Sequence, residues 1–217
     1  MPLQLHAHAF SSYCQKALTA LYENATPFDY IHLGDAAAAQ TLRALWPINR
    51  FPVLVDNGRT IAEASIIIEH LQLAHPGPVR LLPDDARAAL DVRFMDRFFD
   101  LYVHTPMQKI VADRIRAEPL RDAHGVIEAR ALLDTAYRWL EDHLGEHEWA
   151  TASGFSLADC AAAPALFYAD WTHPIAAEFT RVHAYRKRLL ARPSFARAVE
   201  EARPYRSLFP LGAPDRD

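Results

Sequence analysis

The segment Phe10-Ser11-Ser12-Tyr13-Cys14-Gln15-Lys16 lies between an alternating apolar run at residues 3–9 and a helical stripe at residues 12–24. The alternation predicts a strand, and the apolar recurrence every three to four residues predicts a helix. Hydroxyls and one thiol therefore meet the free N–H groups and the positive dipole end of a helix. Such a position suits an anion and lowers the pKa of a thiol.

Two assignments of the cap of this helix are open. Ser12 and Gln15 have the Ser-x-x-Gln spacing of a capping box, which favours Ser12 as the N-cap and leaves the Ser11 hydroxyl free. In the alternative, Ser11 caps the helix and Ser12 is solvated. The spacing favours the first assignment.

The composition is that of a soluble globular protein, with 217 residues, 51% hydrophobic residues and 23% charged residues. A net charge of −4 implies no basic face, so nucleic acid is not an expected partner. The first residues lack a charged n-region, and no apolar run reaches membrane-spanning length. We therefore expect no signal peptide, no membrane contact and a cytoplasmic location, in which the 2 cysteines stay reduced.

The first third of the chain predicts the order βαβαββα. After the segment above come a strand at 27–33, a helix at 36–45, strands at 53–55 and 59–61, and a helix at 63–73. Asn57-Gly58 predicts a two-residue hairpin turn between the paired strands. Pro52, at the mouth of a strand, invites a cis peptide bond. We assign residues 1–75 to one α/β domain.

A linker and an all-helical domain are predicted next. Prolines and a glycine gather in residues 76–85, which we assign as the linker. Residues 86–217 then form an all-α helical bundle, with helices at 86–103, from Pro106 to 115, 126–144, 157–168, 176–191 and 194–203. Ser156 and Asp159 have capping-box spacing, and Cys160 reads as a core thiol.

Four motifs in this order resemble the glutathione S-transferase family, cytosolic and bacterial-like, with a serine-type active site. They are Ser11-Ser12-Tyr13-Cys14-Gln15-Lys16, Phe51-Pro52-Val53-Leu54-Val55-Asp56-Asn57-Gly58, Glu63-Ala64-Ser65-Ile66-Ile67-Ile68-Glu69-His70-Leu71 and Phe155-Ser156-Leu157-Ala158-Asp159. The resemblance covers nearly the whole chain. It implies a thioredoxin-like domain that binds glutathione as co-substrate, a helical domain that binds a small electrophile, and a homodimer.

The resemblance also implies roles for single residues. Ser11 takes the place of the catalytic hydroxyl, and Phe51, before a cis Pro52, pairs its backbone with the cysteinyl part of glutathione. Glu63 and the helix start behind it hold the γ-glutamyl end, and Arg50 lies near the glycine carboxylate. The family usually has serine where this chain has Ala64, so Ser65 or backbone N–H groups must bind that carboxylate.

The chemistry expected of Ser11 is donation of a hydrogen bond to the glutathione sulfur. Lowering a thiol pKa by two units takes about 2.7 kcal/mol. A hydroxyl donor to an anion supplies about 1.5–3 kcal/mol, and a helix dipole about 0.3–1 kcal/mol. The alternative is that Ser11 is a turn residue only.

Two rival functions use other features of the same segment. A peroxidase or thiol reductase would act through Cys14 or through glutathione itself, although Ser11-x-x-Cys14 lacks the first thiol of a dithiol pair. A non-catalytic binding module on the same fold is favoured by Ala64. The sequence leaves these alternatives open.

The second-substrate pocket is expected from residues 100–115, with a residue of the first segment. Candidates are Tyr13, Tyr102, His104, Met107 and Gln108, because aromatic rings and a flexible methionine suit an adaptable apolar pocket. The 11 histidines show no metal-ligand spacing, and we expect no metal.

Overall fold

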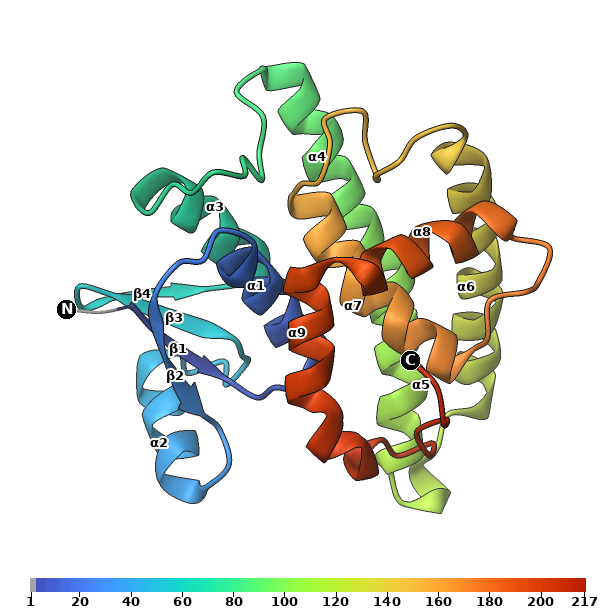
Figure 1. Cartoon of the computed structure of the whole chain (residues 1–217). Helices are drawn as coiled ribbons and strands as arrows, with labels where there is room; N and C mark the ends of the chain where they lie inside the picture. The colour runs from blue at the N-terminus through green and yellow to red at the C-terminus, as the bar shows by residue number, and fades with distance from the viewer. Residues whose placement is uncertain (1–2) are drawn as a thin grey trace.

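A four-stranded sheet with strand order β2-β1-β3-β4 forms the first part of the chain in this computed structural model, which describes residues 3–217 (Figure 1). Residues 1–2, at the start of the expected first domain, lie outside the described residues. The elements of this part are β1 (Leu3–Ala7), α1 (Ser12–Glu23), β2 (Phe28–His32), α2 (Ala36–Leu45), β3 (Val53–Asp56), β4 (Arg59–Ala62) and α3 (Ala64–Ala74). The predicted βαβαββα order is confirmed.

Strand β1 lies in the middle of the sheet. It runs parallel to β2, with Leu5 opposite Tyr30, and antiparallel to β3, with Leu5 opposite Leu54. The β3–β4 hairpin turns at Asn57 and Gly58, whose φ angles are 48° and 83°. Two successive positive φ angles are those of a type I′ turn, as the Asn-Gly pair predicts.

Helices α1 and α3 lie on one side of the sheet and α2 on the other (Figure 1). The apolar cluster under α1 and α3 draws on the sheet and both helices, and includes Leu5, Leu18, Leu21, Leu54, Ile67 and Leu71. Helix α2 buries Leu42 and exposes most of its surface. The sheet is thus covered mainly from the side that faces the rest of the chain.

The second part of the chain is helical throughout. Its elements are α4 (Ala86–Phe98), η1 (Phe99–His104), α5 (Thr105–Ile115), η2 (Glu118–Leu120), α6 (Ala123–Leu144), α7 (Leu157–Thr172), α8 (Thr180–Ala191), α9 (Pro193–Ala202) and η3 (Arg203–Leu208). Between Leu3 and Asp217, no helix is both long enough and apolar enough to cross a membrane.

The structure divides the single helix that the sequence predicts over residues 86–103. Helix α4 ends at Phe98 and continues as a π-helix, η1, before α5 begins at Thr105. Pro106 has no N–H to give to the preceding turn, so the chain widens there. The backbone N–H and the hydroxyl of Thr105 both donate to the carbonyl of Asp100, five residues earlier.

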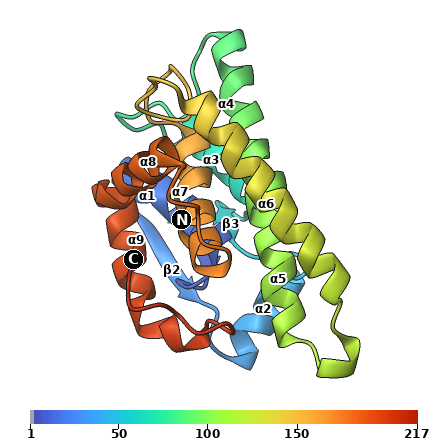
Figure 2. The ribbon, with the colours of Figure 1, turned by 90° about the vertical axis from the view of Figure 1, so that its right-hand side faces the viewer.

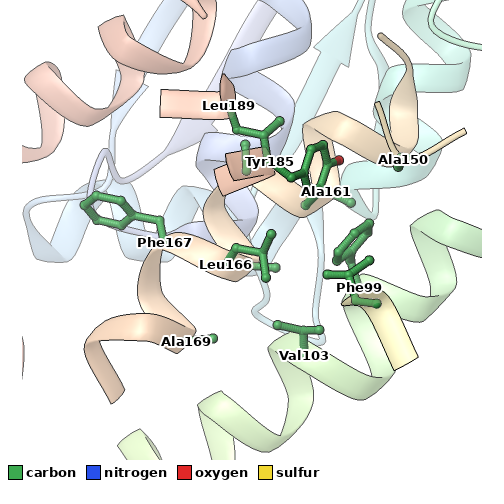
Figure 3. Packing of buried hydrophobic residues seen from close by; sticks show 14 of the residues in the cluster. Phe99, Val103, Ala150, Ala161, Leu166, Phe167, Ala169, Tyr185 and Leu189 are labelled. Atoms are coloured by element: carbon green, nitrogen blue, oxygen red, sulfur yellow. The ribbon is translucent and has the colours of Figure 1, made fainter. Parts of the chain in front are cut away.

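Helix α7 is the centre of the helical part. Each of its residues is buried. Helix α4, η1 and α5 follow one another as a long rod, and α6 runs beside this rod (Figure 2). Helix α7 packs against α4, η1 and α5. In Figure 3, Leu166 of α7 lies among Phe99 and Val103 of η1 and Tyr185 of α8, whereas Phe167 points to the other side of α7. Cys160 is fully buried there, and burial raises the pKa of its thiol, as expected of a core cysteine.

The predicted capping box fixes the start of α7. The Ser156 backbone N–H donates to Asp159 Oδ2 at 2.9 Å. The Asp159 carboxylate is buried and also accepts from the Ala150 backbone and from the Tyr185 hydroxyl. One carboxylate therefore joins the loop before α7 to α8.

A buried ion group joins the two parts of the chain. Lys16 of α1 is fully buried, and its Nζ lies 2.6 Å from Asp96 Oδ1 and 2.9 Å from Asp100 Oδ2. The same Nζ donates to Ser65 Oγ at 2.9 Å. Burial raises the pKa of Asp96 and Lys16 opposes that shift. Removing one partner of such a buried group leaves an uncompensated charge.

Candidate functional site

A cleft of about 640 Å³ opens where the N-terminus of α1 meets the loop before β3, the start of α3, helix α5 and the segment after α9. Six of the residues expected to bind glutathione line it, namely Ser11, Arg50, Phe51, Pro52, Glu63 and Ala64. They come from three separate loops that the sheet holds side by side. The fold thus brings them to one cavity.

Ser11 is the N-cap of α1, with φ −81° and ψ 123°, and its Oγ accepts from the Cys14 backbone N–H at 3.4 Å. The favoured prediction, Ser12 as the cap, is therefore wrong. Ser12 lies buried in the first turn, where its Oγ is 3.5 Å from Gln108 Nε2.

The capping box fails because Gln15 is used elsewhere. Its side-chain amide donates to the Ala9 carbonyl and to the Tyr168 hydroxyl, each at 3.0 Å. The Tyr168 hydroxyl in turn donates to the Phe10 carbonyl at 3.1 Å. Helix α7 therefore holds the loop that carries Ser11.

Cys14 lies behind Ser11 and is fully buried. Burial raises the pKa of its thiol to about 12, although contacts with Ser11 and the His8 backbone oppose the shift. The group is a neutral thiol at physiological pH. The Ser11 hydroxyl can donate one hydrogen bond while it accepts others. Because Cys14 is a thiol and not a thiolate, it is not a charged acceptor that competes with a ligand for the Ser11 proton.

The loop before β3 contains the expected cis peptide bond, between Phe51 and Pro52. Pro52 is buried and Phe51 is half-exposed at the cleft wall. Arg50 is exposed at the rim. A cation at the rim and an apolar wall beneath it suit a ligand that ends in a carboxylate.

The start of α3 offers a second anion position. Glu63, its N-cap, has φ 71° and makes no side-chain cap, so the first N–H groups of the helix keep no side-chain acceptor. Ala64 follows and faces the cleft. The positive end of the helix dipole reinforces these N–H groups.

Ser65 does not take the place of the missing serine hydroxyl. Its Oγ donates to Asp96 Oδ2 at 2.8 Å and accepts from Lys16 Nζ at 2.9 Å. It is absent from the residues that line the cleft. The expectation that Ser65 binds ligand is corrected, because its hydroxyl is committed to the buried ion group.

The wider side of the cleft is apolar. Of the five second-substrate candidates, Tyr13, Met107 and Gln108 line it. Met107 is buried, whereas Gln108 is exposed at the mouth. A flexible thioether beside an aromatic ring adapts to apolar ligands of different shape.

Tyr102 and His104 lie outside the cleft, which corrects two expectations. His104 is fully buried and stacks against Tyr13, with ring centroids 4.2 Å apart and planes 12° from parallel. Neither ring nitrogen has a hydrogen-bond partner within residues 3–217, and burial lowers the pKa of His104 to about 3. Tyr102 is exposed beside Phe98, at a ring distance of 5.8 Å.

Both residues lie in the π-helix η1, ahead of the α5 residues that line the cleft. His104 is buried against Tyr13, and Tyr102 is exposed beside Phe98. The wide turns of a π-helix could not be predicted from the spacing of the candidates.

Ten further lining residues were not among the named candidates, although Thr105, Val111 and Ile115 fall in the range expected to form the pocket. The ten are Phe10, Trp46, Asn49, Thr105, Val111, Ile115, Tyr168, Leu208, Phe209 and Pro210. The apolar triplet 208–210, in an otherwise charged tail, was the sequence feature that could have drawn attention to the last three. The others become neighbours through the fold.

Two family models match the chain. The model Glutathione S-transferase, N-terminal domain, matches residues 5–79, and Glutathione S-transferase, C-terminal domain, matches residues 86–188. The residues between the two matches fall in the segment that joins α3 to α4.

Individual proteins match over different lengths. The chain is 29% identical to Glutathione S-transferase U9 of Arabidopsis thaliana over 108 residues, 49% of this chain and less than half, 45%, of that protein. It is 26% identical to Glutathione S-transferase U24 of the same plant over 198 residues, 88% of this chain and 87% of that protein. The crystal structure of a glutathione S-transferase from Methylobacterium radiotolerans, in complex with glutathione sulfonate, matches with a TM-score of 0.80 and 28% identity over 92% of this chain and 95% of that chain.

Proposed function

The chain belongs to the glutathione S-transferase family, and from that premise we propose that it is a glutathione transferase in which Ser11 activates the glutathione thiol. The observation that carries the proposal is the position of Ser11. Its hydroxyl caps α1 at the floor of a cleft that the cis Pro52 loop and the start of α3 also line. A sulfur bound there meets a hydroxyl donor and a helix dipole together.

Glutathione is proposed to lie across the three loops. Its γ-glutamyl carboxylate binds the free N–H groups at the start of α3, near Glu63 and Ala64. Its cysteinyl backbone pairs with Phe51, and its glycine carboxylate lies toward Arg50 at the rim. Ala64 provides no hydroxyl, so the first carboxylate relies on backbone donors.

Thiol activation then needs no cationic side chain at the sulfur. An ordinary thiol of pKa about 8.5 is only a few per cent thiolate at pH 7. A Ser11 hydrogen bond of about 1.5–3 kcal/mol and a dipole contribution of about 0.3–1 kcal/mol lower this pKa by roughly two units. The thiolate attacks the electrophile, a carbon–sulfur bond forms, and the leaving group departs with its electron pair.

A small apolar electrophile fits the other side of the cleft. Tyr13, Met107, Val111 and Phe209 supply an apolar wall, and Gln108 is a polar group at the mouth. Such walls bind by shape and by loss of apolar surface rather than by a fixed pattern of hydrogen bonds. We propose a broad class of small apolar electrophiles as substrates.

A homodimer and a cytoplasmic location complete the proposal. Apolar side chains are exposed along one face of α4, η1 and α6, among them Leu90, Phe94, Leu101, Tyr102, Leu132 and Trp139. Phe98 packs against Trp139 at a ring distance of 4.5 Å within this face. An exposed aromatic patch of this kind is typical of protein–protein contacts. Tyr102 belongs to this dimer face.

The test is a titration of glutathione into the purified protein, followed by conjugation of a chloronitroarene. Saturable binding, and thiolate absorbance of bound glutathione near neutral pH, are the expected results. Absence of glutathione binding at millimolar concentration would reduce the chain to a non-catalytic member of the fold. A peroxidase that uses Cys14 is not favoured, because its thiol is buried and neutral.

A further inference from the structure

Three potential metal ligands meet on the first part of the chain, away from the residues that line the cleft. Asp56 ends β3 at the hairpin, His70 lies on α3, and His75 is the C-cap of α3. His70 and His75 are five residues apart, a spacing that does not share a helical face. The C-cap conformation of His75, with φ −135° and ψ 56°, leaves the helix and brings its ring back to Asp56.

The three groups converge on one point. His70 Nε2 lies 2.9 Å and His75 Nε2 2.8 Å from the same oxygen, Asp56 Oδ2. All three ligand atoms lie within 4.8 Å of one another. A tetrahedral ion with bonds of about 2.0–2.2 Å needs ligand atoms about 3.3 Å apart. The two distances from Asp56 Oδ2 to the imidazole nitrogens must therefore lengthen by roughly half an ångström when an ion binds.

The surroundings favour this opening. The exposed fractions of the side chains rise from 9% for Asp56 to 15% for His70 and 32% for His75, so an ion can enter past His75. The other carboxylate oxygen, Asp56 Oδ1, accepts from Asn57 Nδ2 at 2.9 Å, which orients the carboxylate. Outer hydrogen bonds of this kind hold a ligand in place.

Within the described residues, Asp56 forms no ion pair with a lysine or an arginine. None of the ion pairs of lysine or arginine within residues 3–217 includes it. Without an ion, both imidazoles can donate to the same oxygen. A divalent cation replaces these two hydrogen bonds with three bonds of its own, and displaces the protons of the imidazoles.

We propose that Asp56, His70 and His75 form a site for a divalent transition ion of the Zn²⁺ class, which ties the β3–β4 hairpin to the C-terminus of α3. Two imidazoles and one carboxylate are donors that suit Zn²⁺, and Co²⁺ or Ni²⁺ as substitutes. Three protein ligands leave a fourth position for water. The role is structural, because the ligands are not among the residues that line the cleft.

The test uses tag-free protein stripped of metal with a chelator. Competition between the protein and a chromogenic chelator for Zn²⁺ should give one ion per chain. His75→Gln, which keeps a hydrogen-bond donor to Asp56 but loses the imidazole, should weaken Zn²⁺ binding at least tenfold, and Asp56→Asn should do the same. His147→Ala, which removes an exposed histidine elsewhere, should leave the affinity unchanged.

A second measurement does not depend on the variants. Co²⁺ added to the wild-type chain should give intense visible absorption bands of a tetrahedral site, lost on addition of excess Zn²⁺ and lost at a pH that protonates imidazole. Zn²⁺ should also raise the midpoint of thermal unfolding. Equal Zn²⁺ affinity in wild type, His75→Gln and Asp56→Asn would overturn the proposal, as would weak octahedral Co²⁺ bands.

Discussion

Ser11 Oγ accepts a hydrogen bond from the backbone N–H of Cys14 at 3.4 Å, so the hydroxyl that caps α1 is also the hydroxyl that faces the cleft. An acceptor role toward the helix leaves its own proton available to a ligand. Capping and activation are therefore compatible in one side chain. Replacing Ser11 tests the capping role and the activating role by two different measurements.

Ser11→Ala should raise the pKa of bound glutathione from about 6.5 by one unit or more, which should lower the thiolate fraction at pH 7, and with it kcat/KM, about threefold or more. Loss of the cap should also cost about 1 kcal/mol of the free energy of unfolding. Thiolate absorbance against pH measures the first effect and urea unfolding the second. Ser12→Ala is the control, and an equal pKa rise there would remove Ser11 from the proposed mechanism.

Cys14→Ala should retain conjugating activity. Burial raises the thiol pKa to about 12, so only about one part in ten thousand is thiolate at pH 8. The native protein should therefore resist iodoacetamide at pH 8, and both cysteines should react once it is unfolded. Rapid alkylation of native Cys14 with loss of activity would instead support thiol chemistry at this residue.

Ala64→Ser should tighten glutathione binding. The added hydroxyl at the cleft can donate to the γ-glutamyl carboxylate, a bond worth about 1.5–3 kcal/mol, or tenfold or more in Kd. Calorimetric titration measures it. The matched change, Ser65→Ala, should lower the free energy of unfolding without a comparable change in Kd, because Ser65 bonds to Lys16 and Asp96. The opposite pattern would place Ser65 at the ligand.

His104→Phe should make the protein less sensitive to acid. The unfolded chain protonates this histidine below pH about 6.5, whereas burial and Lys16 lower its folded-state pKa to about 3. The unfolded state then binds more protons, so wild-type stability falls as pH drops from 6.5 toward 3. Phenylalanine keeps the stack on Tyr13 and cannot titrate.

The measurement is the free energy of unfolding of both proteins between pH 7.5 and 4.5. Relative to its own value at pH 7.5, the wild type should lose on the order of 2–3 kcal/mol more than His104→Phe at pH 4.5. Parallel curves would mean that the histidine becomes protonated in the folded state or is exposed to water.

Phe94→Lys should convert a dimer to a monomer. Phe94 is 51% exposed on the face proposed for the dimer contact, beside Trp139 at a ring distance of 5.9 Å. A charge buried there without a partner destabilises the contact. Sedimentation equilibrium measures the mass. Leu211→Lys, in the C-terminal segment, should leave the mass unchanged, and a monomeric wild type would remove the dimer proposal.

The order of elements could be predicted because local signals agree with the fold. The Asn57-Gly58 turn and the Ser156–Asp159 capping box lie within a few residues of the partners that they bond. The cap of α1 could not be predicted in the same way. Gln15 has its side-chain partner Tyr168 at a sequence distance of 153 residues, and that contact overrides the local rule.

Three predictions about the site were wrong for related reasons. Tyr102 and His104 lie in a π-helix, whose turns a 3.6-residue period does not describe, so the environment of each could not be predicted. Ser65 is bound by Lys16 and Asp96, 49 and 31 residues away in sequence. Residues with a remote partner cannot be assigned a free functional group from sequence spacing alone.

The buried Lys16 limits which first part of the chain can be combined with which second part. Its two carboxylate partners, Asp96 and Asp100, lie in the second part of the chain, beyond the segment that joins α3 to α4. A chimera that took its first 80 residues from a relative without this lysine would place two carboxylates together, with no cation between them. An exchange of the two parts between relatives should therefore give a folded protein only when the lysine and the aspartates are kept together.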